Sequence, residues 1–248
     1  MGNHMLSDLN LAGVRWELVE TPIKQDIQRA PVQQNFQTNT TKPEKPVIVP
    51  PVAPISLETV KSMVTRPSDI DSLIRMICEF NHPLKGGATN TVLPNIAKKP
   101  NGLLIITDLP GTEDDLSGHI LSGNAGEMTD KMLNAIGMSR ENVSIVPILF
   151  WRTPGGRTPS REELDLSMPF VQKILEMLAP RVIITFGTLA TTEITKSNLS
   201  DVHGAEITDD FGRIIVPMYH PNYMILKPSA KKEVWTALQN VQKLLKNV

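Results

Sequence analysis

The segment VPMYHPNYMILKPSAKKEVW, residues 216–235, contains a strand pattern, a loop and the start of a helix. A short apolar run ends at Tyr219, His220-Pro221 follows at once, and a helical pattern begins near Ser229. Because proline restricts the residue before it to extended backbone, His220 is predicted to be held extended at the mouth of the strand. A strand, a loop and a helix in this order are typical of an α/β domain.

Three further apolar runs repeat this pattern, and Pro147 inside one of them predicts an edge strand or a bulge. Ser160 and Glu163 form a capping box for a long helix at 161–178, and Ser68 is predicted to cap an earlier helix. The alternation predicts a mainly parallel sheet with its functional loops beyond the carboxyl ends of the strands. The predicted strands lie at 102–110, 143–150, 181–187 and 212–219, with a minor strand within 202–208.

The composition restricts the classes of function. With 248 residues and a net charge of -1, the chain has no overall basic field for nucleic acid, so any DNA contact must be local. The single cysteine, Cys78, excludes disulfides and any metal site built on several cysteines. No apolar run approaches the roughly 18 residues that span a bilayer. We therefore expect a cytoplasmic monomer without membrane association.

The first part of the chain differs in composition from the rest. Residues 31–54 are rich in Pro, Gln and Thr and lack periodicity, which is typical of a flexible linker. Residues 1–55 are therefore predicted to be a largely disordered arm that could bind a protein partner, and residues 56–248 the folded domain.

Three loops hold the candidate functional residues, and each has a structural alternative. Asp108 at a strand end can orient water or substrate, or belong to an ordinary turn. Arg152, Arg157 and Arg161 can bind phosphates, or be ordinary surface charges. His220 lies at a strand end, although a lone histidine is more often structural. The apolar residues that follow it belong either to the core or to a wedge inserted between bases.

Taken together, these loops resemble the uracil-DNA glycosylase superfamily, nearest its family 4. The family's first motif aligns without gaps with TDLPGTEDDLSGHILSGNAGE. Its CRPPxNRxP loop corresponds to WRTPGGRTP, and its HPSYLLR motif corresponds to HPNYMILK. The strand PRVIITFGTLA matches PxVIVxLGxxA. The resemblance covers residues 68–247 and depends on four motifs in order.

The resemblance implies a three-layer α/β/α sandwich around a four-stranded, mainly parallel sheet. It also implies that uracil or a related deaminated base is flipped out of single- or double-stranded DNA and that its N-glycosidic bond is hydrolysed, as in base excision repair. By this resemblance the catalytic residues are His220, a hydrogen-bond donor to the leaving base, and Asp108. The implied DNA contacts are Arg152, Arg157 and Lys227 on phosphates, with Met224 and Ile225 as wedge.

Several features depart from the family pattern, among them the acid of the first motif, which is shortened from glutamate to Asp108. The four cysteines that hold its [4Fe–4S] cluster correspond here to Cys78, Asn81, Trp151 and Ser167, so we expect no cluster and no other metal. In the base pocket, formed with Pro110 and Gly111, the stacking aromatic residue becomes Leu121 and the base-reading asparagine becomes Pro147.

These replacements leave two functions open. Loss of a base-reading side chain removes base discrimination by that route. The chain is therefore expected to be a DNA glycosylase with shifted or relaxed specificity. The alternative is a catalytically degenerate glycosylase fold that acts as a DNA-binding or interaction module. An unrelated nucleotide-binding α/β domain is a third interpretation, against which the absence of P-loop and Rossmann motifs counts.

Overall fold

The computed structural model describes residues 55–246. The predicted arm, residues 1–55, therefore lies almost entirely outside the described residues. The strands are β1 (Leu103–Thr107), β2 (Ser144–Pro147), β3 (Val182–Phe186), β4 (Ile207–Thr208) and β5 (Ile214–Met218). The helices are α2 (Leu57–Met63), α3 (Ile70–Glu79), α4 (Thr112–Ser117), α5 (Gly123–Ala135), α6 (Arg161–Leu178), α7 (Thr188–Thr195), α8 (Leu199–Val202), α9 (Pro221–Leu226) and α10 (Lys231–Lys246).

The strands form one sheet in the order β2-β1-β3-β5-β4. The first four are parallel, and the two-residue β4 adds an antiparallel edge to β5. The predicted parallel sheet is therefore confirmed. The minor strand expected within 202–208 is also present as β4, and it is shorter than expected. β2 lies at the other edge, as Pro147 indicated, because proline lacks the N–H that an inner strand would donate.

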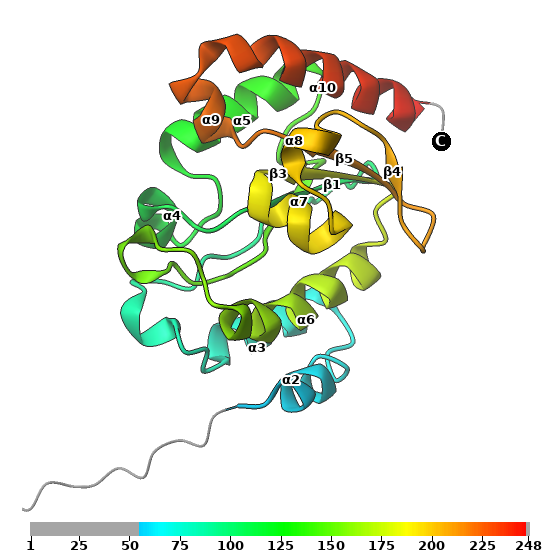
Figure 1. Cartoon of the computed structure of the whole chain (residues 1–248). Coiled ribbons are helices and arrows are strands. Elements are labelled where there is room, and N and C mark those ends of the chain that lie inside the picture. The colour runs from blue at the N-terminus through cyan, green and yellow to red at the C-terminus, as the bar shows by residue number, and fades with distance from the viewer. Residues whose placement is uncertain (1–54, 247–248) are drawn as a thin grey trace, which may run out of the picture. The chain divides into compact units, whose positions relative to one another are not determined.

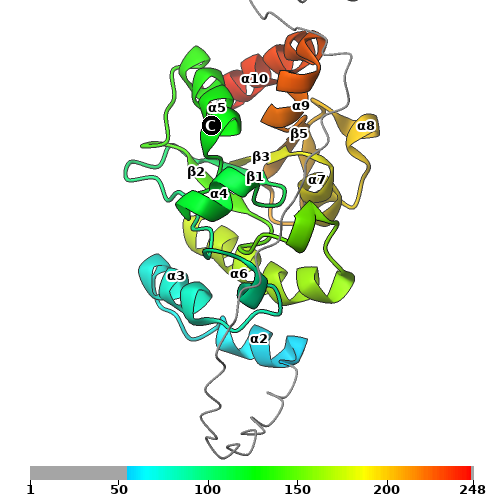
Figure 2. The same cartoon turned by 90° about the vertical axis from the view of Figure 1, so that its left-hand side faces the viewer.

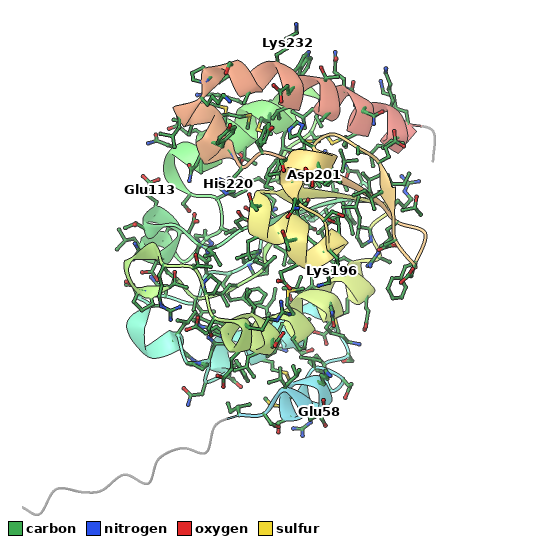
Figure 3. All side chains as sticks on the ribbon, viewed as in Figure 1. Glu58, Glu113, Lys196, Asp201, His220 and Lys232 are labelled. Carbon is green, nitrogen blue, oxygen red and sulfur yellow. The ribbon has the colours of Figure 1, made fainter. Side chains whose placement is uncertain are left out.

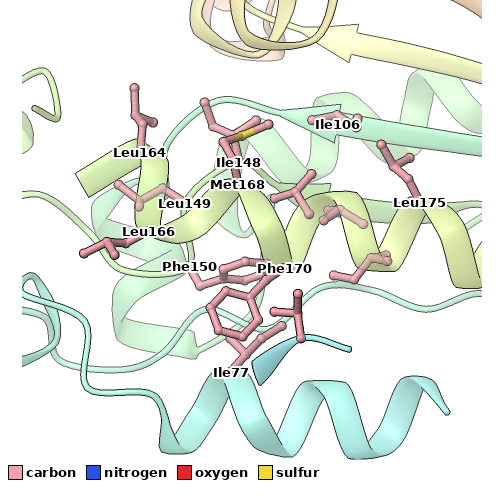
Figure 4. Packing of buried hydrophobic residues seen from close by; sticks show 14 of the residues in the cluster. Ile77, Ile106, Ile148, Leu149, Phe150, Leu164, Leu166, Met168, Phe170 and Leu175 are labelled. Atoms are coloured by element: carbon pink, nitrogen blue, oxygen red, sulfur yellow. The ribbon is translucent and has the colours of Figure 1, made fainter. Parts of the chain in front are cut away.

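Helices cover both faces of the sheet, which gives the α/β/α layering (Figure 1). Helices α5 and α10 lie on one face, and α6 with α3 and α2 on the other. Because side chains alternate along a strand, Leu104 and Ile106 of β1 join the core under α6, whereas Leu103 and Ile105 join the core under α5 and α10. Figure 4 shows the first of these cores, where Phe150 and Phe170 pack above Ile77.

Local structure follows the predicted signals with three differences. The capping box of Ser160 and Glu163 starts α6 as predicted. The cap of α3 is Asp69, not Ser68, because the Asp69 carboxylate accepts the N–H of Ser72. The acidic run after Gly111 forms α4, and the residues after His220 form α9, although both were expected to be loops.

Candidate active site

Three loops meet at the carboxyl edge of the sheet, which Figure 2 shows from the side of α4, α7 and α9. Backbone hydrogen bonds join the strand ends there. The N–H of Asp108 donates to the carbonyl of Phe186 (3.1 Å), and the N–H of Gly187 donates to that of Met218 (3.0 Å). Asp108 and His220 are thereby placed on neighbouring sides of the end of β3.

The Asp108 carboxylate lies at the N-terminus of α7. Its Oδ1 accepts the backbone N–H of Ala190 at 2.6 Å, although the two residues are 82 positions apart in the sequence. Burial raises the pKa of Asp108 to about 6, and the backbone hydrogen bonds from Ala190, Leu189 and Thr188 act in the opposite direction. The carboxylate is thus oriented by the helix and ionised at neutral pH.

His220 is the N-cap of α9, and Pro221 occupies the first helical position. Its Nδ1 accepts the backbone N–H of Asn222 at 3.2 Å. An imidazole nitrogen that accepts a hydrogen bond holds no proton, so in the neutral ring the proton is on Nε2. Burial lowers the pKa of His220 to about 4. The ring is therefore a neutral donor through Nε2 at physiological pH.

Asp108 and His220 line one cavity of about 490 Å³. Figure 3 places His220 on the side of the domain where α4 and α9 lie. The cavity has the size of a small-ligand site. Its other walls are Leu109 after β1, Gly156, Thr158 and Pro159 of the second loop, Thr188, Leu189 and Thr192 of α7, and Asn222 of α9.

The predicted base-pocket residues do not line this cavity. Leu121 is 2% exposed within the core under α5, and Pro147 is buried and paired with Thr107 in the sheet. Pro110 is also buried, and the N–H of Gly111 donates to the Asp114 side chain at 2.8 Å. The structure thus brings together the two predicted catalytic residues but not the four predicted base-pocket residues.

The segment that contains Leu121 has an unusual backbone. Leu121 has φ 51°, a left-handed conformation that is rare for a side chain of this size. The guanidinium of Arg140 donates to the carbonyls of Ile120 (3.0 Å) and Leu121 (2.6 Å) and forms an ion pair with Asp130. Arg140 therefore stabilises the turn that holds Leu121 inside the core.

The N-terminus of α5 has a carboxylate partner. Glu113 accepts the N–H of Asn124 at 3.3 Å. An added Cβ at Gly123 would lie 1.8 Å from a carboxylate oxygen of Glu113. This terminus therefore serves the internal contact between α4 and α5.

The arginines of the second loop differ in their partners. Arg157 forms a two-pronged ion pair with Glu163, which lowers the pKa of that carboxyl. Arg161 pairs with Asp165 and Glu193. Arg152, in contrast, makes no hydrogen bond or ion pair with any residue in 55–246. The expected phosphate role of Arg157 therefore conflicts with its internal pairing, and Arg152 is the available cation of this loop.

The predicted wedge is corrected in part. Met224 is 1% exposed and belongs to the core, because α9 is amphipathic and packs against α5. Ile225 is 40% exposed and Leu226, which the sequence did not single out, is 84% exposed. Lys227 is exposed, as a phosphate contact requires. The exposed aliphatic residues of α9 are therefore Ile225 and Leu226.

Sequence reasoning also missed the polar wall of the cavity. Four of its lining residues carry polar side chains: Thr158, Thr188, Thr192 and Asn222. The spacing of Thr188 and Thr192, four residues apart on a short helix, was a signal for one shared face. Nothing in the sequence indicated that this face would turn toward His220.

The residues at the implied cluster positions do not fit an iron–sulfur cluster. The chain has a single cysteine, and it is exposed. Trp151 is 0% exposed, stacks on His82 at 4.4 Å and donates from its indole N–H to Thr91. The Ser167 hydroxyl donates to the carbonyl of Ile148 at 2.8 Å. These positions hold packed side chains and offer no set of thiolates.

Gly187→Ala is expected to disturb the site directly. Gly187 has φ 99°, and an added Cβ would lie 2.1 Å from Oδ2 of Asp108, so backbone strain of about 1–3 kcal/mol and displacement of the carboxylate are expected. The matched control is Gly212→Ala, where φ is 78° and no atom lies within 4 Å. Chemical denaturation should show strain in both variants, and only Gly187→Ala should lose the base excision that the family resemblance implies. Equal activity in the two variants would contradict the placement of Asp108 in the site.

The fold and site define a class of protein: an α/β/α domain with an oriented carboxylate and a neutral histidine at the carboxyl edge of its sheet. Comparison with known families identifies this class. The model of the uracil DNA glycosylase superfamily matches residues 94–240. Because the match covers more than half of the chain, the protein belongs to this superfamily.

Individual relatives agree with this assignment. The chain is similar to the Type-4 uracil-DNA glycosylase of Archaeoglobus fulgidus, with 27% identity over 187 residues, 71% of this chain and 92% of the relative. It is 28% identical to the Type-4 enzyme of Pyrobaculum aerophilum over 61% of this chain and 81% of the relative. The Type-4 enzyme of Thermotoga maritima is 29% identical over 58% of this chain and 76% of its own length.

Proposed function

We propose that the chain is a DNA glycosylase of base excision repair that hydrolyses the N-glycosidic bond of uracil or a related deaminated base flipped out of DNA. The observation that supports this most is the placement of Asp108 and His220 in one cavity. Family membership and the Type-4 relatives give the reaction class.

The geometry suggests a role for each residue. When the bond between the sugar C1′ and the base nitrogen breaks, its electron pair leaves with the base and positive charge grows on the sugar. The Nε2–H of His220 donates a hydrogen bond to the departing base, an interaction that strengthens as negative charge develops. The Asp108 carboxylate stabilises the positive sugar and accepts a proton from the water that adds to C1′.

Base selectivity is expected to differ from that of an enzyme with an asparagine in place of Pro147. Proline offers neither a side-chain amide nor an N–H. Besides Asp108 and His220, the residues with polar side chains that line this cavity are Thr158, Thr188, Thr192 and Asn222. They can exchange donor and acceptor roles, which favours several deaminated bases over one.

The test is single-turnover excision on matched oligonucleotides that contain uracil, hypoxanthine or xanthine, each single-stranded and in duplex. The glycosylase proposal requires base release by the intact chain from at least one of these substrates. Absence of product from all of them, with DNA binding retained, would replace it by the second candidate.

That second candidate is a degenerate glycosylase fold that binds DNA without cleaving it. The observation that favours it is the burial of Leu121 and Pro147, which the resemblance places in the base pocket. It requires salt-dependent binding to DNA, because phosphate contacts release counterions, with no base release under any condition.

We further propose that packed aromatic side chains replace an iron–sulfur cluster as the link between α3, α6 and the second loop. The ring of Phe80 lies 5.1 Å from Phe170 and 6.0 Å from Trp151, and Phe150 lies 5.9 Å from Trp151. Figure 4 shows two of these rings, Phe150 and Phe170, between α6 and α3. Such a core stabilises the loop that holds Arg152 without iron.

Trp151→Ala is therefore expected to lower the free energy of unfolding by about 3–5 kcal/mol through lost packing and a cavity. Phe211→Ala, at an aromatic side chain that is 81% exposed, is the control and should cost little. Iron and sulfide analysis of protein made in iron-replete cells should find no stoichiometric cluster. A bound cluster, or a Trp151 variant as stable as the control, would refute the proposal.

A further inference from the structure

Three aromatic rings contact one another in series beside the cavity, the first two stacked and the last two tilted. The ring of His203 lies 4.0 Å from that of Tyr219 at an interplanar angle of 28°. The ring of Tyr219 lies 4.8 Å from that of Tyr223 at 39°. Tyr219, the middle ring, directly precedes His220 of the catalytic cavity. Tyr223, the last ring, lies in the first turn of α9.

The outer end of the ring series is accessible and positively charged. Tyr223 is 37% exposed, and the ammonium of Lys227 lies 5.7 Å from its ring centroid. Lys231 and Lys232 follow, and Figure 3 shows Lys232 projecting outward from α10. Between His220 and Trp235 the only acidic residue is Glu233. Exposed rings next to cations are the combination that binds the bases and phosphates of a single strand.

A second cavity lies at the inner end of the series. It has about 660 Å³ and is lined by His203, Tyr219, Asn240 and Lys243 among others. This volume suits a nucleotide-sized ligand. The Nε2 of His203 is buried and has no hydrogen-bond partner among residues 55–246.

We propose that Tyr223, supported from behind by Tyr219 and His203, is a stacking platform for an unpaired base of the DNA strand next to the flipped base. The proposal rests on the proposed function, since it extends the substrate of that same site. Bases of a single strand have free faces that can stack on the rings, whereas the faces of paired bases are covered in the duplex. The platform therefore favours single-stranded substrate over duplex.

Lys227 has a defined part in this binding mode. Its contact with Tyr223 is an exposed cation–π interaction, which is weak enough for a base to displace. The displaced ammonium then lies beside the strand and pairs with a phosphate. The ring of Tyr223 thus supplies stacking, which does not depend on salt, and Lys227 supplies a contact that weakens as salt rises.

The experiment measures binding of the full chain to an unmodified ten-nucleotide oligothymidylate and to a matched duplex, by fluorescence anisotropy at low and high salt. Tyr223→Ala is expected to weaken single-strand binding by about 5- to 100-fold, the range for loss of one stacked base. Tyr223→Phe keeps the ring and should bind as the unaltered chain does. Phe211→Ala removes an exposed ring at the opposite end of β5 and should also leave binding unchanged.

The outcomes separate this proposal from the proposed function. Unchanged single-strand binding in Tyr223→Ala overturns the platform, and so does an equal loss on duplex. A loss that disappears at high salt would indicate a general electrostatic surface and would also overturn it. Excision is measured on the same proteins: if the unaltered chain releases no base, the glycosylase proposal fails, and the binding comparison still decides the platform.

Discussion

His220→Ala is expected to lower the single-turnover rate of base excision by about 10²–10³-fold, the range for loss of one hydrogen-bond donor to a developing anion. The reason is the protonation state of the ring: Nδ1 accepts the N–H of Asn222, and burial lowers the pKa of His220 to about 4. A neutral ring with its proton on Nε2 needs no proton from solvent. The rate of the unaltered chain should therefore not decline from pH 6 to pH 8 through titration of His220.

Because His220 is also the N-cap of α9, a second variant separates structure from catalysis. His220→Asn keeps a capping acceptor but has no donor at the position of Nε2. It should remain as stable as the unaltered chain at pH 7.5 and lose as much activity as His220→Ala. His119→Ala, at an exposed histidine outside the cavity, is the control. Full activity in His220→Asn would show that the histidine serves only as a cap.

The sequence predicted the fold well where local signals and burial agree. The apolar runs of β1, β3 and β5 and the capping box of α6 are strong local patterns, and each has a match in the structure. The segments after Gly111 and His220 were taken for loops because glycine and proline often mark turns. Both are short helices, since Pro221 fits the first helical turn and Asp114 accepts the N–H of Gly111.

The site was predictable only in part, for a physical reason. Asp108 and His220 could be found because each follows a strand of a parallel sheet, so topology alone brings them to one edge. Their immediate partners could not be found in this way. The contact of Asp108 with Ala190 spans 82 residues, and the pairing of Arg157 with Glu163 depends on how the second loop folds back on α6. Side-chain direction decides such contacts.

Asp108→Asn is expected to reduce excision by about 10²-fold or more, because the amide can neither accept the proton of water nor stabilise a positive sugar by charge. In the unaltered chain the rate should fall about tenfold per pH unit below pH 6, where the buried carboxyl becomes protonated. The variant should lose this dependence and keep a low, level rate, measured by single turnover from pH 5 to pH 8. If the excision rate of the variant still declined below pH 6, the titrating group would be one other than Asp108.

The same substitution should increase stability at neutral pH. Between pH 3.8 and 6 the folded state binds more protons at Asp108 than the unfolded state does, so the free energy of unfolding falls as pH rises through this window. Asp108→Asn removes that loss, and the variant should exceed the unaltered chain by about 3 kcal/mol at pH 7 and by little near pH 4. Urea unfolding of both proteins at several pH values measures this difference. The contributions of titratable groups that the two proteins share cancel when the two free energies of unfolding are subtracted.

His220 provides the opposite slope. Its folded-state pKa of about 4 lies below the ordinary 6.5, so the unfolded state binds more protons between these values and stability rises with pH. Relative to the unaltered chain, the free energy of unfolding of His220→Asn should therefore fall from pH 4 to pH 6, whereas that of Asp108→Asn should rise. Burial at the same cavity edge thus shifts both pKa values toward the form with less charge, although Asp108 is still ionised at pH 7. If Asp108→Asn is less stable than the unaltered chain at pH 7, the carboxylate acts mainly as an ionised cap of α7 and is a positioning residue.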